Sequence, residues 1–150
     1  MRVSVYWIGK PRLSGATTLA DEYCRRIGRY CDFHAQEIRA PRGRSQRTAG
    51  EETAFLSKTE GLLRVVLDPG GKICTSQDLA EYVEKMRDGG ARGVAFLVGG
   101  ADGFTKPFLK QADLKLSLSP LTLPHELARV VLLEQIYRAF ATLSHHPYSR

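Results

Sequence analysis

Short apolar runs alternate along the chain with longer segments whose apolar residues recur every three or four positions. Residues 2–8 alternate in polarity and end before Gly9, which is typical of a β-strand. Residues 62–67 and 94–98 are almost continuously apolar, as expected of strands buried on both faces of a parallel sheet. Shorter runs at 33–38 and 114–118 complete a predicted set of five strands.

Helical periodicity fills the segments between these strands. Residues 13–30 place Leu19, Tyr23 and Ile27 at spacings of four, which predicts an amphipathic helix with its arginines on the solvent side. This helix is followed by the second short strand and then by a polar loop over residues 40–46.

Capping residues locate the remaining helices. Thr48, with Glu51 three residues later, predicts a capping box at the start of a weak helix that ends near residue 58. Ser76 is expected to cap a third helix, which ends at a pair of glycines. Pro124 suits the first position of a long final helix that runs to about residue 143.

Alternating strands and helices predict an α/β fold with a parallel sheet flanked by helices. At 150 residues, with no internal repeat and no linker-like segment, the chain is expected to be a single domain over residues 1–150. Hydrophobic residues make up 43% and charged residues 25%, as in ordinary globular proteins. No apolar run approaches the length of a membrane span, so no membrane partner is expected.

Cysteine usage adds an expectation about the compartment. Cys24, Cys31 and Cys74 cannot all pair and have no C-x-x-C spacing. They indicate a reducing, cytoplasmic environment and no structural zinc site. The adjacent His145 and His146 have no carboxylate or cysteine at useful spacing, so no metal is expected.

The net charge of +6 is concentrated near the start of the chain. Residues 1–50 hold ten Lys and Arg against four Asp and Glu, and the remaining residues hold twelve of each. Arginines in a flexible loop suit contacts with phosphates, and a solvated loop is the alternative. The candidates for RNA binding are Arg25, Arg29, Arg42, Arg44 and Arg47, together with Arg150 at the end of the chain.

Three motifs in the last third of the chain could carry chemistry. The first, Leu97-Val-Gly-Gly-Ala-Asp-Gly103, puts glycines directly after a strand, where the backbone can approach a ligand closely. The second is Leu116-Ser-Leu-Ser-Pro-Leu-Thr-Leu-Pro-His125, and the third is the tail His146-Pro-Tyr-Ser-Arg150. Each of the first two alone is explained equally well by a turn or a strand-to-helix connection.

Taken in this order, the three motifs resemble the SPOUT-class methyltransferases that methylate N3 of a pseudouridine in large-subunit (23S) ribosomal RNA. The resemblance covers the whole chain and is densest in its last third. It implies a C-terminal trefoil knot (an α/β knot), in which the final helix threads a loop. It also implies a homodimer with the substrate site at the subunit boundary, acting on the large subunit or the assembled ribosome.

The same resemblance implies S-adenosyl-L-methionine (SAM) as cofactor. Apolar side chains would hold its adenine while backbone groups read the edge of the ring. The matching positions are Leu67, Gly99, Gly100, Leu118, Ser119, Pro120, Leu121, Thr122 and Leu123.

The sequence does not identify the catalytic base. The candidates for a catalytic role are Arg129, His146 and Tyr148. Arg129 or Arg138 is expected to face the RNA or the cofactor carboxylate, or else to belong to a buried polar set that includes Glu134. The tail departs from the family pattern, because Ser149 stands where the family usually has histidine.

The final helix has apolar residues on more than one side, which favours contact with both the sheet and a second copy of the chain. Two other functions remain open from the sequence. One is a catalytically inactive RNA- or ribosome-binding protein of the same fold. The other is a nucleotide- or flavin-binding enzyme, which the missing glycine fingerprint after the first strand disfavours.

Overall fold

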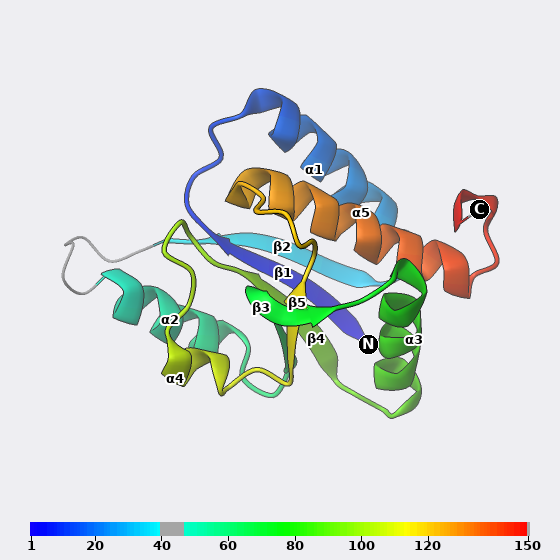
Figure 1. Cartoon of the computed structure of the whole chain (residues 1–150). Coiled ribbons are helices and arrows are strands. Elements are labelled where there is room, and N and C mark those ends of the chain that lie inside the picture. Colours follow the sequence, from blue (N-terminus) through cyan, green and yellow to red (C-terminus); the bar gives the residue numbers. More distant parts are fainter. Residues whose placement is uncertain (40–46, 150) are drawn as a thin grey trace.

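A parallel five-stranded sheet runs through the centre of the molecule (Figure 1). The computed structural model describes residues 1–39 and 47–149, without the side chains of Arg47 and Ser149. The strand order is β2-β1-β4-β3-β5, and every neighbouring pair is parallel, which confirms the predicted fold class. The strands are β1 (Arg2–Ile8), β2 (Asp32–Ile38), β3 (Leu63–Ile73), β4 (Gly93–Val98) and β5 (Leu114–Ser117).

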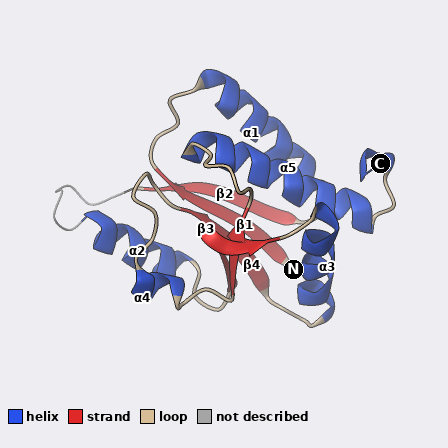
Figure 2. Cartoon of the chain, in the orientation of Figure 1, coloured by secondary structure: helices blue, strands red, loops and turns tan. Residues whose placement is uncertain are grey.

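Helices cover both faces of this sheet (Figure 2). One face packs against three helices and the other against two shorter ones, each with its own hydrophobic cluster. The first group is α1 (Ser14–Ile27), α3 (Ser76–Asp88) and α5 (His125–Leu143). The second group is α2 (Arg47–Lys58) and α4 (Lys106–Leu109), and a short 3₁₀ helix, η1 (Pro147–Ser149), follows α5. Within the described residues, none of these helices has the length and apolar character needed to cross a bilayer.

Strand β4 shows why the central strands are apolar throughout. Its side chains point alternately to the two faces, so Val94 and Phe96 enter the cluster under α5, while Ala95 and Leu97 enter the cluster above α2. All six residues of β4 are buried. The continuous apolar run in the sequence is therefore the expected pattern for a strand covered on both faces.

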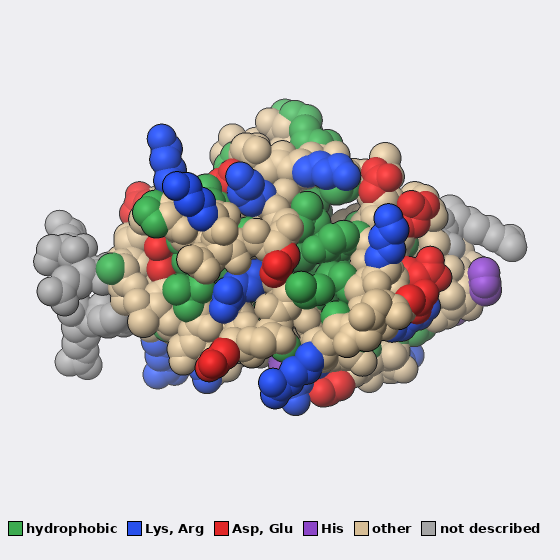
Figure 3. Space-filling model, turned by 90° about the horizontal axis from the view of Figure 1, so that it is seen from below, with side chains coloured by type: hydrophobic (Ala, Val, Ile, Leu, Met, Phe, Trp, Pro, Cys, Tyr) green, Lys and Arg blue, Asp and Glu red, His purple; other side chains and the backbone are tan. Residues whose placement is uncertain are grey.

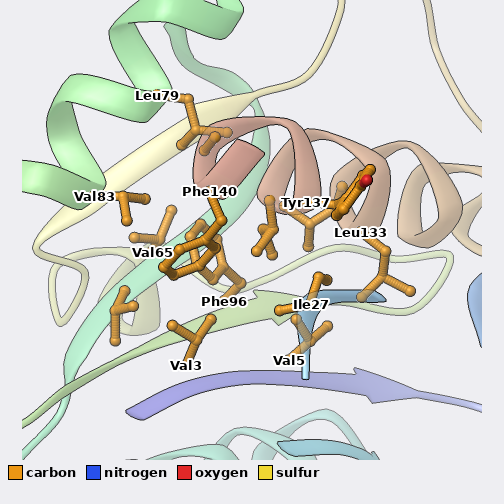
Figure 4. Packing of buried hydrophobic residues seen from close by; sticks show 14 of the residues in the cluster. Val3, Val5, Ile27, Val65, Leu79, Val83, Phe96, Leu133, Tyr137 and Phe140 are labelled. Atoms are coloured by element: carbon orange, nitrogen blue, oxygen red, sulfur yellow. The ribbon is translucent and has the colours of Figure 1, made fainter. Parts of the chain in front are cut away.

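Helix α5 lies between the sheet, α1 and α3, and Figure 4 shows Phe140 pointing toward Phe96 of the sheet. Nine of its residues are buried by contacts within the chain. The apolar character of α5 is thus explained by its own chain. The expected contact of α5 with a second copy stays a prediction.

Strand β3 continues six residues beyond the predicted end at Leu67. The sequence Asp68-Pro-Gly-Gly71 looks like a turn, but it forms an irregularity in the strand, and pairing with β5 resumes at Lys72. A Cβ atom on Gly71 would lie 2.7 Å from the backbone carbon of Lys115, so this position accepts only glycine.

Several predicted helix boundaries are wrong by one or a few residues. Thr75, not Ser76, caps α3 and forms a capping box with Asp78. Helix α2 already begins at Arg47, so Thr48 lies inside it and is not its cap. Pro124 is the residue before α5, not its first residue.

Two further differences concern α1 and α4. Helix α1 ends at Ile27, and Leu19 is 51% exposed instead of lying on the buried face. The short helix α4 was not predicted, although Thr105 caps it by accepting a hydrogen bond from the backbone N–H of Phe108.

Phe55 is the centre of the cluster between the sheet and helices α2 and α4, and its side chain is 0% exposed. Replacing it with alanine should lower the free energy of unfolding by about 3–5 kcal/mol, because the change removes a large buried ring and leaves a cavity. The measurement is urea unfolding. Phe33→Ala is the control. Because Phe33 is only partly buried, its replacement should lower the free energy of unfolding clearly less. Equal losses for the two variants would contradict this account of the core.

Candidate functional site

A cavity of about 540 Å³ opens at the carboxyl ends of β3, β4 and β5. This edge of a parallel sheet is where α/β proteins usually place their ligands. All nine residues that the sequence analysis assigned to a cofactor lie in its wall: Leu67, Gly99, Gly100, Leu118, Ser119, Pro120, Leu121, Thr122 and Leu123. The structure therefore brings together three segments that are far apart in the sequence.

The glycine turn after β4 forms one wall of the cavity. The N–H of Gly103 donates to the carbonyl of Gly100 at 3.1 Å, and Gly103 has a φ of 67°, which favours glycine. A Cβ atom on Gly99 would lie 3.1 Å from the ring of Phe104, which stacks on Phe108. The constraint on Gly99 is therefore packing against Phe104, and a valine there would disturb the fold around the turn as well as any ligand.

The segment between β5 and α5 forms the facing wall. Ser117 donates its hydroxyl to the carbonyl of Ser119, and the hydroxyl of Ser119 accepts the N–H of Leu121 at 2.9 Å. These two bonds hold the loop in a tight turn. Leu121 lines the cavity and is 76% exposed, so most of this apolar side chain is open to solvent.

Glu126, in the first turn of α5, ties the loop after β1 to the same region. Its Oε1 atom accepts the backbone N–H of Arg12 at 2.7 Å and that of Leu13 at 3.1 Å. These hydrogen bonds, with Leu13 contributing most, lower the pKa of Glu126. The neighbouring residues His125 and Ala128 line the cavity, so this bond connects the loop to the cavity wall. The role of Glu126 in holding the loop after β1 was not predicted from the sequence. The one feature that could have indicated it is the position of a carboxylate at the start of a helix.

Arg129 is buried, with 4% exposure, and is not among the residues that line the cavity. Its guanidinium lies over the ring of Trp7 at 4.2 Å from the centroid. Burial lowers the pKa of Arg129. In this structure Arg129 belongs to the packing between α5 and β1, and its expected contact with the RNA or a cofactor carboxylate stays a prediction.

The other two catalytic candidates lie at the far end of α5. The hydroxyl of Tyr148 donates to Glu134 Oε1 at 3.1 Å and lies 3.3 Å from the hydroxyl of Tyr23. His146 Nδ1 accepts the backbone N–H of Tyr148 at 3.2 Å. Burial is the main cause that raises the pKa of Tyr148, and its hydrogen bonds with Tyr23 and Glu134 add to it.

Arg138 belongs to the same polar set. It pairs with Glu134 at 2.7 Å and lies over the ring of Tyr148 at 4.9 Å, which confirms the alternative that these residues form an ion-pair network. From Ala128 at the cavity to Arg138 the helix rises by about 15 Å. Within one chain, the tail and the cavity therefore lie apart.

Of the six candidates for RNA contact, two are described with their side chains. Arg25 is exposed and pairs with Glu22 at 2.8 Å, and Arg29 is exposed at the end of α1. Arg42, Arg44, Arg150 and the side chain of Arg47 lie outside the described residues. In the part of the chain that the structure covers, no group of three His, Cys, Asp or Glu side chains is arranged to hold a metal ion.

Comparison with known proteins identifies the class. A family model described as "Predicted SPOUT methyltransferase" matches residues 1–149. The chain therefore belongs to the SPOUT methyltransferase family. It is 44% identical over 150 residues to a ribosomal RNA large subunit methyltransferase H of Thermus thermophilus, with 100% of this chain and 99% of that protein covered. The methyltransferase of the same name from Koribacter versatilis is 40% identical, with 99% of this chain and 97% of that protein covered.

Solved structures support the fold. The tRNA (m1G37) methyltransferase of Aquifex aeolicus matches with a TM-score of 0.57 at 11% identity, covering 92% of this chain and 70% of that one. A Legionella pneumophila methyltransferase solved with SAM matches with a TM-score of 0.54 at 15% identity, covering 93% and 66%. With the family match, these likenesses give the chain the α/β-knot fold, as the resemblance implied.

The bond from Glu126 to the loop after β1 should make stability depend on pH in the acid range. The folded pKa lies below the ordinary value of 4.5, so the stabilisation is fully present above that value and is lost as the pH falls through the folded pKa. Glu126→Gln should therefore be less stable than the wild type at pH 7, and this difference should shrink at pH 3. Urea unfolding at the two pH values measures the difference.

The matched control for this prediction is Glu60→Gln, which changes an exposed carboxylate elsewhere. It should leave the free energy of unfolding nearly unchanged at both pH values. A difference between the wild type and Glu126→Gln that stays constant from pH 7 to pH 3 would show that the charge of Glu126 does not stabilise the loop.

Proposed function

We propose that the protein is a single-domain methyltransferase, spanning residues 1–150, that uses SAM to methylate N3 of a pseudouridine in large-subunit ribosomal RNA. The observation that carries this proposal is the cavity at the carboxyl edge of the sheet, whose wall contains every position of the family's cofactor motifs. The names of the full-length relatives support the ribosomal substrate.

The residues around this cavity fit SAM in size and chemistry. Its volume of about 540 Å³ is within the range of sites for small cofactors. Leu67, Leu118 and Leu123 offer apolar surfaces for the adenine, and the glycine turn at 99–103 offers backbone groups without interfering side chains. When bound, SAM supplies the methyl group as an electrophile.

The protein's contribution to the reaction is mainly placement. Transfer of a methyl group to a ring nitrogen requires the acceptor to lie in line with the donor, and fixed geometry can supply most of the acceleration. The N3 proton of pseudouridine is acidic for an amide, and a nearby cation would lower its pKa further and help to remove it. Tyr148 and His146 are candidates for contact with the base, although the helix separates them from the cavity of their own chain.

That separation favours a homodimer in which the tail of one chain approaches the cavity of the other. Four leucines are exposed where α1 and α5 begin and beside the cavity. Their exposed fractions are 55% for Leu13, 51% for Leu19, 76% for Leu121 and 44% for Leu127. We call them the leucine patch. Exposed leucines near one site favour burial against a second copy, and a symmetric dimer pairs such a surface with itself.

We expect the RNA to contact the basic N-terminal part of the chain, together with Arg150 at its end. Arg25 and Arg29, with Arg42, Arg44, Arg47 and Arg150, would contact phosphates and position the ribosomal RNA, in the free large subunit or the assembled ribosome. Cys24, Cys31 and Cys74 are free thiols, which agrees with activity in the cytoplasm, where ribosomes are modified.

Incubation with SAM and ribosomes that lack the modification tests the function directly. Mass spectrometry should find one added methyl group on a pseudouridine of the large-subunit RNA. Binding to ribosomes without transfer of a methyl group would instead identify the protein as an inactive RNA-binding member of the family.

Ala128 offers a test of the cofactor cavity, because it lines the cavity from the first turn of α5 and is only partly buried. Ala128→Phe would place a ring in the cavity and should weaken SAM binding at least about tenfold, which corresponds to about 1.4 kcal/mol. Calorimetric titration with SAM gives the affinity. Ala128→Ser keeps the side chain small and should bind as the wild type does. Wild-type affinity in the phenylalanine variant would exclude this cavity as the SAM site.

The leucine patch predicts the oligomeric state. Light scattering should show a dimer at micromolar concentration for the wild type and a monomer for Leu19→Glu combined with Leu127→Glu, because two buried charges per chain would oppose association. Ile73→Glu, at an apolar position of 60% exposure outside the patch, should remain a dimer. A monomeric wild type would refute the shared site.

A further inference from the structure

A second cavity, of about 830 Å³, lies at the opposite edge of the sheet from the SAM cavity. We call it the amino-edge cavity, because it opens where β3, β4 and β5 begin. Its wall comes from three separate segments: residues 61–64 before and in β3, residues between 82 and 93 at the end of α3 and the start of β4, and residues 110–113 before β5. No part of it coincides with the wall of the SAM cavity.

Part of the wall of the amino-edge cavity, which we call its floor, consists of apolar side chains and one aromatic residue. Leu62, Leu63 and Met86 line it, and Tyr82 is half-buried at its side. Figure 3, which views the molecule from below, shows hydrophobic side chains gathered in the middle of this face between charged ones. Burial raises the pKa of Tyr82, so its ring stays neutral at physiological pH. The cavity wall therefore contains a neutral aromatic residue of the kind on which a base can stack.

The rim of the same cavity is basic. The cations are Arg64, Lys85, Arg92 and Lys110, and Asp113 is the one carboxylate in the wall. Asp113 already accepts the backbone N–H of Arg64 at 2.7 Å. Among the described residues, none of the four cations forms a salt bridge within 4.0 Å.

Nearby acidic groups do not cancel this charge within the cavity. Glu84 and Asp88 of α3 lie 3.7 Å and 3.2 Å from Arg87, and none of these three residues lines the cavity. The side chain of Arg64 donates to the hydroxyl of the buried Thr59 at 2.7 Å and to the carbonyl of Leu56 at 3.5 Å, so this cation is partly engaged by neutral groups at the end of α2. The rim thus keeps an excess of positive charge that faces an apolar floor.

We infer that the amino-edge cavity binds a nucleotide of a single-stranded RNA segment, with its base on the floor beside Tyr82 and the flanking phosphates at the basic rim. An aromatic ring within a positively charged groove is the usual arrangement for holding single-stranded nucleic acid. The cations come from three separate segments, so they can meet phosphates on both sides of one base. A free nucleotide has phosphate on one side of its base only, so it would contact only some of these cations.

This inference rests on the proposed function, since the RNA would belong to the ribosomal substrate. It adds a contact on the opposite edge of the sheet from the site of methyl transfer. Such a contact would fix the orientation of the enzyme on its substrate, because phosphate contacts and stacking set register while the chemistry occurs elsewhere.

The stacking part is tested with a fluorescently labelled, unstructured single-stranded RNA and two variants of Tyr82. Tyr82→Leu keeps an apolar side chain but removes the ring, and should weaken binding by about five- to a hundredfold. Tyr82→Phe keeps the ring and should bind as the wild type does. Equal losses in both variants, or no loss in the leucine variant, would overturn the stacking contact. Thermal unfolding of each variant shows that the fold is kept.

The phosphate part is tested with two double variants of equal charge change. Lys85→Gln with Lys110→Gln should reduce the slope of log affinity against log salt by about 1.4, at about 0.7 for each lost contact with a single strand. The control is Lys58→Gln with Lys72→Gln, two exposed lysines outside the cavity, which should change the slope less. Identical slopes for the two double variants would overturn the proposal.

Two further measurements separate this inference from its rivals. GMP and AMP should compete with the RNA only weakly, and competition as strong as that of the RNA itself would assign the cavity to a free nucleotide instead. Methyl transfer to ribosomes, measured on the same proteins, should show a raised KM in Tyr82→Leu. If the wild type is active and Tyr82→Leu has the same KM as the wild type, the RNA contact at the amino-edge cavity is refuted. If the wild type itself transfers no methyl group, the proposed function is refuted instead.

Discussion

Burial of helix α5 on three sides is the constraint on which the rest of this structure depends. The helix is covered by the sheet, by α1 and by α3, so it must be apolar almost all round. Close approach of these helices requires small side chains, and Ala20, Ala80 and Ala139 are all buried in the same cluster. Because α5 cannot shift without opening this core, the segment that leads into it is held against the ends of β3 and β4. The cavity proposed to bind SAM is thus a consequence of how α5 is packed.

Arg129 and Glu134 are two of the polar residues of α5, and the structure accommodates each differently. Arg129 lies over Trp7, where the charge is stabilised by the ring although burial lowers its pKa. Glu134 instead accepts hydrogen bonds from Arg138 and Tyr148, so its charge is paired. The first residue ties the start of the helix to β1, and the second ties its end to the tail. Both ends of α5 are therefore fixed by polar contacts, while the middle is fixed by packing.

The sequence predicted the order of the strands along the chain and the regions of the main helices, because buried strands and amphipathic helices have distinct periodicities. It did not predict the extension of β3, since Asp68-Pro69-Gly70 has the composition of a turn and only the pairing with β5 makes it part of a strand. The nine residues of the cavity wall came from the family resemblance, not from periodicity. The contact of Arg129 with Trp7 was not predicted because the two residues lie far apart in the chain, and no local pattern links them.

The state of Tyr148 bears on what the tail can contribute to the reaction. Its pKa is raised by burial and by its bonds with Tyr23 and Glu134, so the phenol stays protonated at neutral pH. A protonated phenol can donate a hydrogen bond but is a poor base. If the tail approaches the cavity of a partner chain, Tyr148 could donate to a substrate base only by giving up its bond to Glu134, while Arg138 lies beside it as a fixed cation. Such groups orient a base and stabilise negative charge on it, which is what methyl transfer to an acidic ring nitrogen requires more than a strong base.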